Sequence, residues 1–101
     1  MIYLQASYPC SQPGRLILKL CKHFRHKVPA EFSAERGEVD FQPGRCSMRA
    51  GAESLLILIE GEDEQAIGRM QYILLDHVRR MERRPDLELA WAAGAVPVAA
   101  G

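Results

Sequence analysis

The segment Leu55-Leu56-Ile57-Leu58-Ile59 is apolar at every position and constrains the fold more than any other part of the chain. It is far shorter than the run of about 20 apolar residues that a membrane-spanning helix needs. Its aliphatic side chains are typical of a buried β-strand. A strand that is apolar on both sides is usually central in its sheet, or is covered on both faces. We therefore expect a sheet built around residues 55–59.

Two segments with helical periodicity flank this strand. Between residues 15 and 28 the apolar residues recur on one side of a 3.6-residue repeat, and the following proline predicts a helix end near Lys27. A second apolar stripe runs over residues 66–81. Asp63 is the predicted N-cap of this second helix, and Pro85 stops it. Acidic residues before the second helix and arginines at its end both stabilise its dipole.

Alternation of apolar and polar residues predicts further strands. Residues 39–41 and 46–49 alternate in this way on either side of Pro43-Gly44, a pair that favours a turn. Additional strands are predicted at residues 3–8, 28–32 and 87–91.

The predicted order, β-α-(β)-β-β-β-α-β, indicates an α+β fold. We expect an antiparallel-rich sheet with both helices packed on one face, so that the two apolar stripes close a single core. Residues 1–91 form the predicted single domain. Residues 92–101 are small, uncharged and interrupted by glycine and proline, so we expect them to form a flexible tail.

Composition and motifs argue against several classes of protein. The first residues have neither a basic flank nor a long apolar stretch, so no signal peptide is predicted. Three cysteines at irregular spacing favour free thiols in a reducing cytoplasm over a disulfide framework. The net charge of zero gives no indication of nucleic-acid binding, and no membrane association is expected.

The neutral total nevertheless hides an uneven distribution of charge. Residues 1–30 contain five basic residues and no acid, a sum of +5. Residues 31–101 contain the other eight basic residues and all 13 acids, a sum of −5. Either the two parts neutralise each other in the fold, or the first helix keeps its positive field for an anionic partner.

The first helix has the most distinctive surface. Its apolar residues and Cys21 share one side, whereas a cationic ridge on the other side consists of Arg15, Lys19, Lys22 and His26. The ridge predicts a site for a phosphate, a carboxylate or an acidic protein partner. The alternative is a solvated helix face whose charges meet acids from elsewhere in the fold.

Histidines and cysteines suggest a second kind of site. His23 and His26 are three residues apart, and with Cys21, Cys46 or His77 they are candidate ligands for zinc, copper or iron. Cys21 and Cys46 fall at positions predicted to be buried, where thiols are mostly inert. His77 lies in the apolar stripe of the second helix, either as a satisfied buried residue or as a proton donor or ligand facing a pocket. The sequence does not identify a metal or a cofactor.

Several segments resemble one bacterial family, domain of unknown function 2218. They are Leu20-Cys21-Lys22-His23-Phe24, His26-Lys27-Val28, Phe41, Gly44-Arg45-Cys46, Asp76-His77-Val78 and Leu89-Ala90-Trp91. The resemblance covers residues 15–91, and it departs from the family pattern at residues 81–86. Members of the family sometimes occur beside, or fused to, siderophore-interacting flavin reductases, which implies a role near iron or siderophore uptake. The strand order also resembles the C-terminal domain of phosphohexomutases, although the phosphate-binding loop of those enzymes is missing.

We interpret the chain as a small cytoplasmic binding or accessory module rather than an enzyme. Its partner would be a small anionic ligand or another protein. The residues predicted to bind it are Lys19, Lys22, His23, His26, Lys27, Cys46 and His77. Two alternatives remain open: a metal- or redox-linked sensor or enzyme that uses the histidines and cysteines, and a structural domain that forms homodimers.

Overall fold

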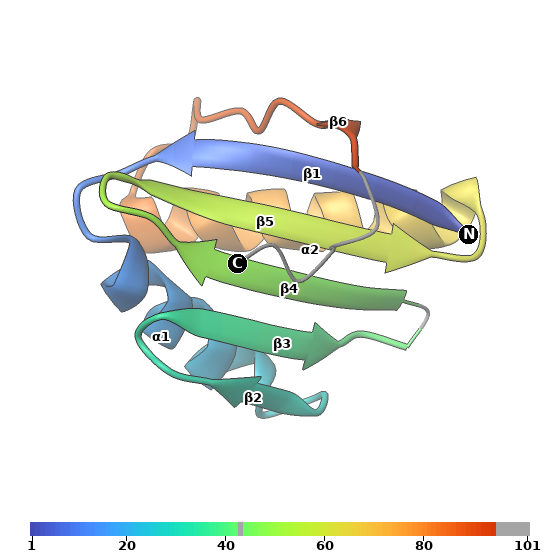
Figure 1. Cartoon of the computed structure of the whole chain (residues 1–101), viewed down its shortest axis with the longest axis horizontal. Coiled ribbons are helices and arrows are strands. Elements are labelled where there is room, and N and C mark those ends of the chain that lie inside the picture. The colour runs from blue at the N-terminus through green and yellow to red at the C-terminus, as the bar shows by residue number, and fades with distance from the viewer. Residues whose placement is uncertain (43, 95–101) are drawn as a thin grey trace.

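The strands of the computed structural model, which describes residues 1–42 and 44–94, lie in one antiparallel sheet (Figure 1). The order of the strands across this sheet is β2-β3-β4-β5-β1-β6. Both helices lie behind the sheet in Figure 1, and therefore cover the same face. The predicted α+β architecture is confirmed. The strands are β1 (Ile2–Pro9), β2 (Ala30–Phe32), β3 (Arg36–Asp40), β4 (Gly44–Ala50), β5 (Ser54–Gly61) and β6 (Ala92–Ala93).

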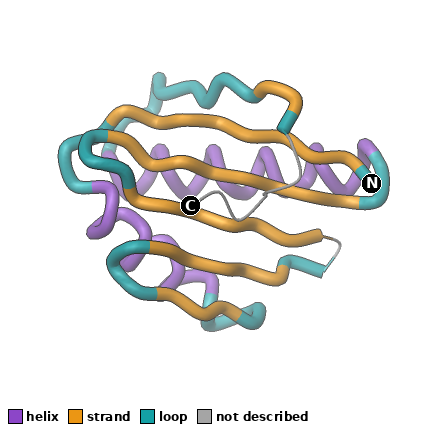
Figure 2. The backbone as a smooth tube through the Cα atoms, viewed as in Figure 1, coloured by secondary structure: helices purple, strands orange, loops and turns teal. Residues whose placement is uncertain are grey.

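Strand β5 is central, as its apolar run predicts. It pairs along its full length with β1 and over seven residues with β4, and Ile57 lies between Ala6 and Met48. Its side chains alternate between the two faces: Leu55, Ile57 and Ile59 are buried, whereas the residues between them are half-buried. Only one face of β5 is covered by helices (Figure 2). The uninterrupted apolar run therefore reflects its central position.

Helix α1 (Pro13–Phe24) packs its apolar side on the sheet. Leu16, Ile17, Leu20 and Cys21 are buried there, and each buried aliphatic side chain stabilises the fold by about 1.5–3 kcal/mol. The helix begins two residues earlier than the pattern suggests, because proline is well tolerated in a first turn. It ends three residues earlier than predicted, and residues 25–27 form turns.

Helix α2 (Glu64–Glu82) crosses the same face of the sheet. The predicted N-cap is confirmed, since the Asp63 carboxylate accepts a hydrogen bond of 2.8 Å from the Ala66 backbone nitrogen. The C-terminal end is closed by Arg83, which adopts the left-handed conformation with φ 55°. The buried side of α2 consists of Ala66, Ile67, Met70, Leu74 and Val78.

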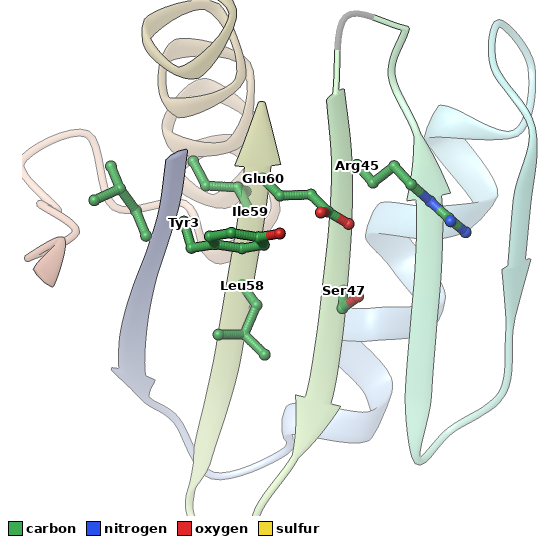
Figure 3. Close-up of a pocket in the computed structure, with 7 residues that line it drawn as sticks. Tyr3, Arg45, Ser47, Leu58, Ile59 and Glu60 are labelled. Atoms are coloured by element: carbon green, nitrogen blue, oxygen red, sulfur yellow. The ribbon is translucent and has the colours of Figure 1, made fainter. Parts of the chain in front are cut away.

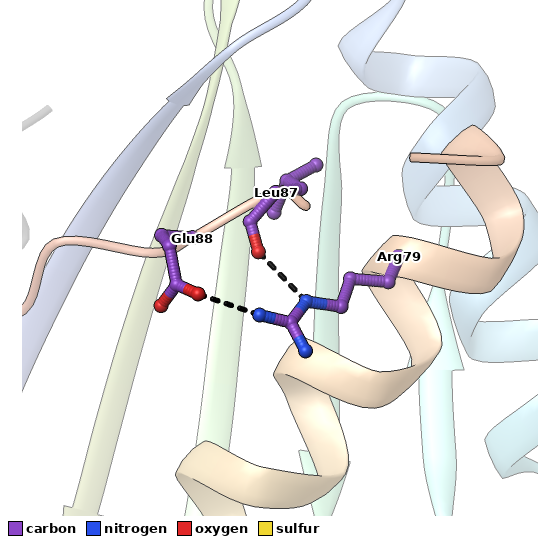
Figure 4. A network of polar contacts seen from close by, with 3 residues as sticks. All are labelled: Arg79, Leu87 and Glu88. Carbon is purple, nitrogen blue, oxygen red and sulfur yellow. Dashed lines mark hydrogen bonds and ion pairs between the residues drawn. The ribbon is translucent and has the colours of Figure 1, made fainter. Parts of the chain in front are cut away.

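The predicted strand at residues 87–91 is wrong. Arg79 of α2 holds this segment, because its Nε donates to the Leu87 carbonyl at 2.7 Å and its Nη2 donates to the Glu88 carboxylate at 2.6 Å (Figure 4). The alternation of apolar and polar residues reflects contact with the core, in which Leu87 is buried. The last strand among the described residues is β6, which pairs with Leu4 and Gln5 of β1.

Strand β6 lies beyond the domain boundary predicted at residue 91. Most of the predicted tail, residues 95–101, lies outside the described residues. Neither described helix is long and apolar enough to span a membrane.

Candidate functional site

A groove of about 500 Å³ opens between the C-terminal end of α1 and the middle of α2. The segment that follows β3 contributes to the groove as well. No acidic side chain is found among the described residues that line it. The groove therefore combines apolar and basic groups without a neutralising carboxylate. The lining residues are His23, Phe24, Lys27, Val28, Phe41, Gln42, Arg69, Tyr72, Ile73 and His77.

Aromatic rings in edge-to-face contact form one side of the groove. The Phe24 ring centroid lies 5.0 Å from that of Phe41 and 4.9 Å from that of His77. Contacts of this kind add stability beyond the burial of area, and they fix the orientation of each ring. Phe24 and Phe41 are buried in the core, so the sheet and α1 hold this surface in place.

His23 of α1 and His77 of α2 meet in the groove. Their ring centroids are 4.7 Å apart and their planes are inclined by 51°. The Nδ1 atom of His77 lies 2.7 Å from the Ile73 carbonyl oxygen. Since a carbonyl only accepts hydrogen bonds, Nδ1 must carry the hydrogen, and Nε2 bears the lone pair of the neutral ring.

The surroundings of His23 disfavour its protonated form. Partial desolvation, followed by the positive charges of His77, His26, Lys27 and Arg80, lowers the pKa of His23 below its ordinary value. Asp76, the residue before His77, forms an ion pair of 3.3 Å with Arg80. The region around the two rings is therefore electropositive.

Two basic side chains and one tyrosine complete the groove. Lys27 follows the end of α1, whereas Arg69 and Tyr72 are one turn apart on α2. Tyr72 is 73% exposed, which is unusual for a large aromatic side chain. An exposed ring beside two cations is well suited to contact the flat apolar part of an anion.

The structure brings together three of the seven residues predicted to bind a partner: His23, Lys27 and His77. Lys19 lies in a separate polar hollow of about 320 Å³ near the beginning of α1, which Arg15 and Glu82 also line. Lys22 and His26 are exposed and do not line the groove. Of the predicted cationic ridge, Arg15 and Lys19 therefore line the polar hollow, and no ridge residue lines the groove.

Cys46 lies far from solvent. Its side chain is 0% exposed on the helix-covered face of β4, where burial raises its pKa strongly. Burial also raises the pKa of the Cys21 thiol to about 11. Both groups are therefore protonated at neutral pH and closed to a ligand. Among the described residues, no three His, Cys, Asp or Glu side chains gather closely enough to hold a metal ion.

The basic side chains of α1 form no ion pair with an acid among the described residues. The ion pairs of Arg79 with Glu88 and of Arg80 with Asp76 lie in the C-terminal part of the chain. Arg15 donates a hydrogen bond of 3.4 Å to the neutral side chain of Gln12, and Arg25, which follows α1, lies over the Phe32 ring at 5.3 Å. Glu82 lines the same hollow as Arg15 and Lys19, so part of the positive charge of α1 has an acidic neighbour.

Arg69, Tyr72, Phe41 and Gln42 escaped the sequence-based prediction of the site. Arg69 and Tyr72 lie at the polar border of the α2 stripe, where helical periodicity predicts ordinary surface residues. Phe41 has the signature of a core residue. The helical spacing of Arg69, Tyr72 and His77 places them on neighbouring faces, but only the packing of α1 against α2 shows what they face.

A second hollow lies on the opposite face of the sheet, between Tyr3, Arg45, Leu58 and Glu60 (Figure 3). Its volume of about 10 Å³ is close to the space that one water molecule needs. It is too small to hold an organic ligand without rearrangement. The groove between the helices is therefore the better candidate.

Known proteins resemble this chain in sequence and in fold. The family described as "Uncharacterized protein conserved in bacteria (DUF2218)" matches residues 5–92. The NMR structure of PA4090 from Pseudomonas aeruginosa is 31% identical in sequence, with a TM-score of 0.79 over 94% of this chain and 100% of that chain. No curated protein matches. The resemblance noted in the sequence is confirmed: the chain belongs to the bacterial DUF2218 family.

Proposed function

We propose that this protein is a binding module that takes up a small organic anion in the groove between α1 and α2. The observation that supports this proposal is the composition of the groove. A fixed apolar surface around Phe24 and Phe41 lies beside Lys27 and Arg69, and no described lining residue is acidic. The apolar body of the ligand would lie on the rings, and its charged group would meet the two cations.

The volume of the groove limits the size of the ligand. About 500 Å³ is within the range of pockets that bind small molecules, which is roughly 300–1,000 Å³. Tyr72 lines the groove and is exposed, so this side of the groove is accessible to solvent. A monocarboxylate with one ring or a short chain fits these properties.

Arg69→Gln and Lys27→Gln test the proposal, because each substitution removes one positive charge from the groove. Each should weaken binding of benzoate about tenfold or more, as expected when a charged hydrogen bond is lost. Isothermal titration calorimetry at low salt measures the change. Lys22→Gln removes the same charge from the exposed side of α1 and is the matched control.

Equal affinity in wild type, Arg69→Gln and Lys27→Gln would contradict the proposal, as would a loss of affinity in Lys22→Gln alone. The latter result would return attention to the outer side of α1 as the binding surface. The melting temperature of each variant should stay within a few degrees of wild type, since Lys27 and Arg69 are exposed.

The other interpretations of the sequence differ in what supports them. The metal- or redox-linked site loses its thiol ligands, because Cys21 and Cys46 are buried in the core. The link to iron or siderophore uptake rests on the family resemblance, and the homodimer and the cytoplasmic location also stay predictions. An accessory protein that binds an anion reversibly is compatible with a role in iron or siderophore uptake, with a homodimer and with a cytoplasmic location.

A further inference from the structure

We propose that the groove selects aromatic carboxylates and binds them together with a proton, which the His23–His77 pair receives. This inference rests on the proposed function and concerns the same site. It names the class of ligand and the protonation change that accompanies binding.

The first argument concerns the rings that the groove presents. Phe24, Phe41 and His77 form a chain of edge-to-face contacts, and His23 extends it, with its ring centroid 6.1 Å from that of Phe24. Tyr72 adds an exposed ring. Aromatic side chains recognise another ring through offset stacking and edge-to-face contact, which a saturated ring cannot reproduce. A planar aryl group should therefore be preferred over an alicyclic group of the same size.

The second argument concerns charge in the empty groove. Among the described residues, the charged groups that line the groove or lower the pKa of His23 are positive: His26 and Lys27 on the side of α1, and Arg69 and Arg80 on α2. Asp76, which precedes His77, is paired with Arg80. The segment after β3 contributes the neutral Phe41 and Gln42. A proton added to His23 therefore meets repulsion from these charges, and the His77 ring lies 4.7 Å away.

A bound carboxylate reverses this balance. It places a negative charge where the described lining provides none, so that one imidazolium becomes favourable beside it. The hydrogen bond from His77 Nδ1 to the Ile73 carbonyl leaves Nε2 as the atom of that ring that accepts a proton. The carboxylate itself stays ionised near neutral pH, since its acidity is like that of a glutamate side chain. The complex therefore contains up to one more proton than its separate components.

Calorimetric titration with benzoate measures this proton. The binding enthalpy is compared in two buffers with different ionisation enthalpies, at a pH of about 6.5. We expect uptake of a substantial fraction of one proton, which falls towards zero near pH 8.5. Because binding and proton uptake are thermodynamically linked, the affinity for benzoate must rise as the pH is lowered. The rise is up to about tenfold per pH unit in the pH range where a proton is taken up.

Variants assign the proton to the pair. His23→Gln replaces an exposed side chain, should not disturb folding, and should reduce the uptake. The double variant His23→Gln/His77→Gln should abolish it. His26 is the remaining histidine of the chain, does not line the groove, and acts on His23 less than His77 does, so His26→Gln should retain most of the proton uptake. Uptake that persists in the folded double variant, or that is lost in His26→Gln, would overturn the assignment.

Cyclohexanecarboxylate and inorganic phosphate complete the test. Cyclohexanecarboxylate has the same charge and a similar size, and we expect it to bind several-fold more weakly than benzoate. Affinity equal to or above that of benzoate would overturn the preference for aromatic ligands. Binding of benzoate without proton uptake would overturn the inference and leave the proposed function intact. Failure of all three anions to bind would overturn the proposed function itself.

Discussion

His23 links the groove to the stability of the fold through its protonation. Its pKa is lowered in the folded protein, first by partial desolvation and then by the neighbouring positive charges of His77, His26, Lys27 and Arg80. Between this lowered pKa and the ordinary value of about 6.5, the unfolded chain binds more protons than the folded chain. The free energy of unfolding therefore falls as the pH is lowered through this window. Above the window His23 is neutral in both states and does not affect stability.

Replacing His23 by Gln should make stability less sensitive to acid. We expect His23→Gln to lose less free energy of unfolding than wild type between pH about 7 and about 5.5, because the substituted side chain does not titrate. Urea unfolding at several pH values measures this slope. Lys22→Gln removes a charge that is not among those lowering the pKa of His23, so it is the control and should keep the wild-type slope; an unchanged slope in His23→Gln would contradict the assigned environment.

Cys10 should be the only one of the three thiols that reacts in the folded protein. It is half-buried, whereas Cys21 and Cys46 are fully buried, and burial raises the pKa of both. The Cys10 pKa is also raised, by desolvation and then by Glu82, so its reaction should be slow at neutral pH and faster as the pH rises.

A chromogenic disulfide reagent measures these thiols. One thiol should be labelled in the native protein and three after denaturation. Mass spectrometry of the modified peptides then identifies which cysteine reacted. Labelling of Cys46 before unfolding would show that the core of the sheet opens more readily than its packing indicates.

The contact of β4 with β5 and α2 depends on Gly44. A Cβ atom at this position would overlap the Glu60 carbonyl oxygen and lie 2.5 Å from Cε of Met70. Because the obstructing oxygen belongs to the backbone of β5, we expect Gly44→Ala to destabilise the protein by about 1–3 kcal/mol. Gly68, exposed within α2, has open space at its Cβ position, so Gly68→Ala should stabilise the protein by about 0.5–1 kcal/mol.

Chemical denaturation of the two alanine variants measures both effects. The opposite signs make the comparison informative, since the same substitution is made twice. A neutral Gly44→Ala would mean that β4 and β5 separate at this end more easily than their pairing suggests.

The helices and the central strand could be predicted because local periodicity determines them. The apolar stripe of α2 and the Asp63 cap are properties of neighbouring residues, and the run in β5 is continuous. The segment at residues 87–91 has an equally regular alternation, yet Arg79 binds its backbone and keeps it off the sheet. The contact joins a helix side chain to the backbone eight residues later, and an alternation of apolar and polar residues does not indicate such a contact.

Only some of the residues that line the groove could be predicted, because the groove is formed by segments distant in sequence. The histidines and Lys27 belong to recognisable motifs, whereas Arg69 and Tyr72 acquire a role only when α2 packs beside α1. The sequence separates a basic part, residues 1–30, from an acidic part, residues 31–101, and the fold shows which of these charges form ion pairs. Among the described residues, no acid forms an ion pair with the basic side chains of α1, although Glu82 lines the same hollow as Arg15 and Lys19.

Mapping of benzoate onto the protein by two-dimensional NMR tests whether the groove is the binding site. Backbone amide shifts should change at Phe24, Lys27, Gln42, Tyr72 and His77, the segments that surround the groove, and the changes should saturate together. They should weaken in Arg69→Gln and persist in Lys22→Gln. Shifts that cluster instead around Arg15 and Lys19, or no shifts at any residue, would contradict the assignment of the groove as an anion-binding site.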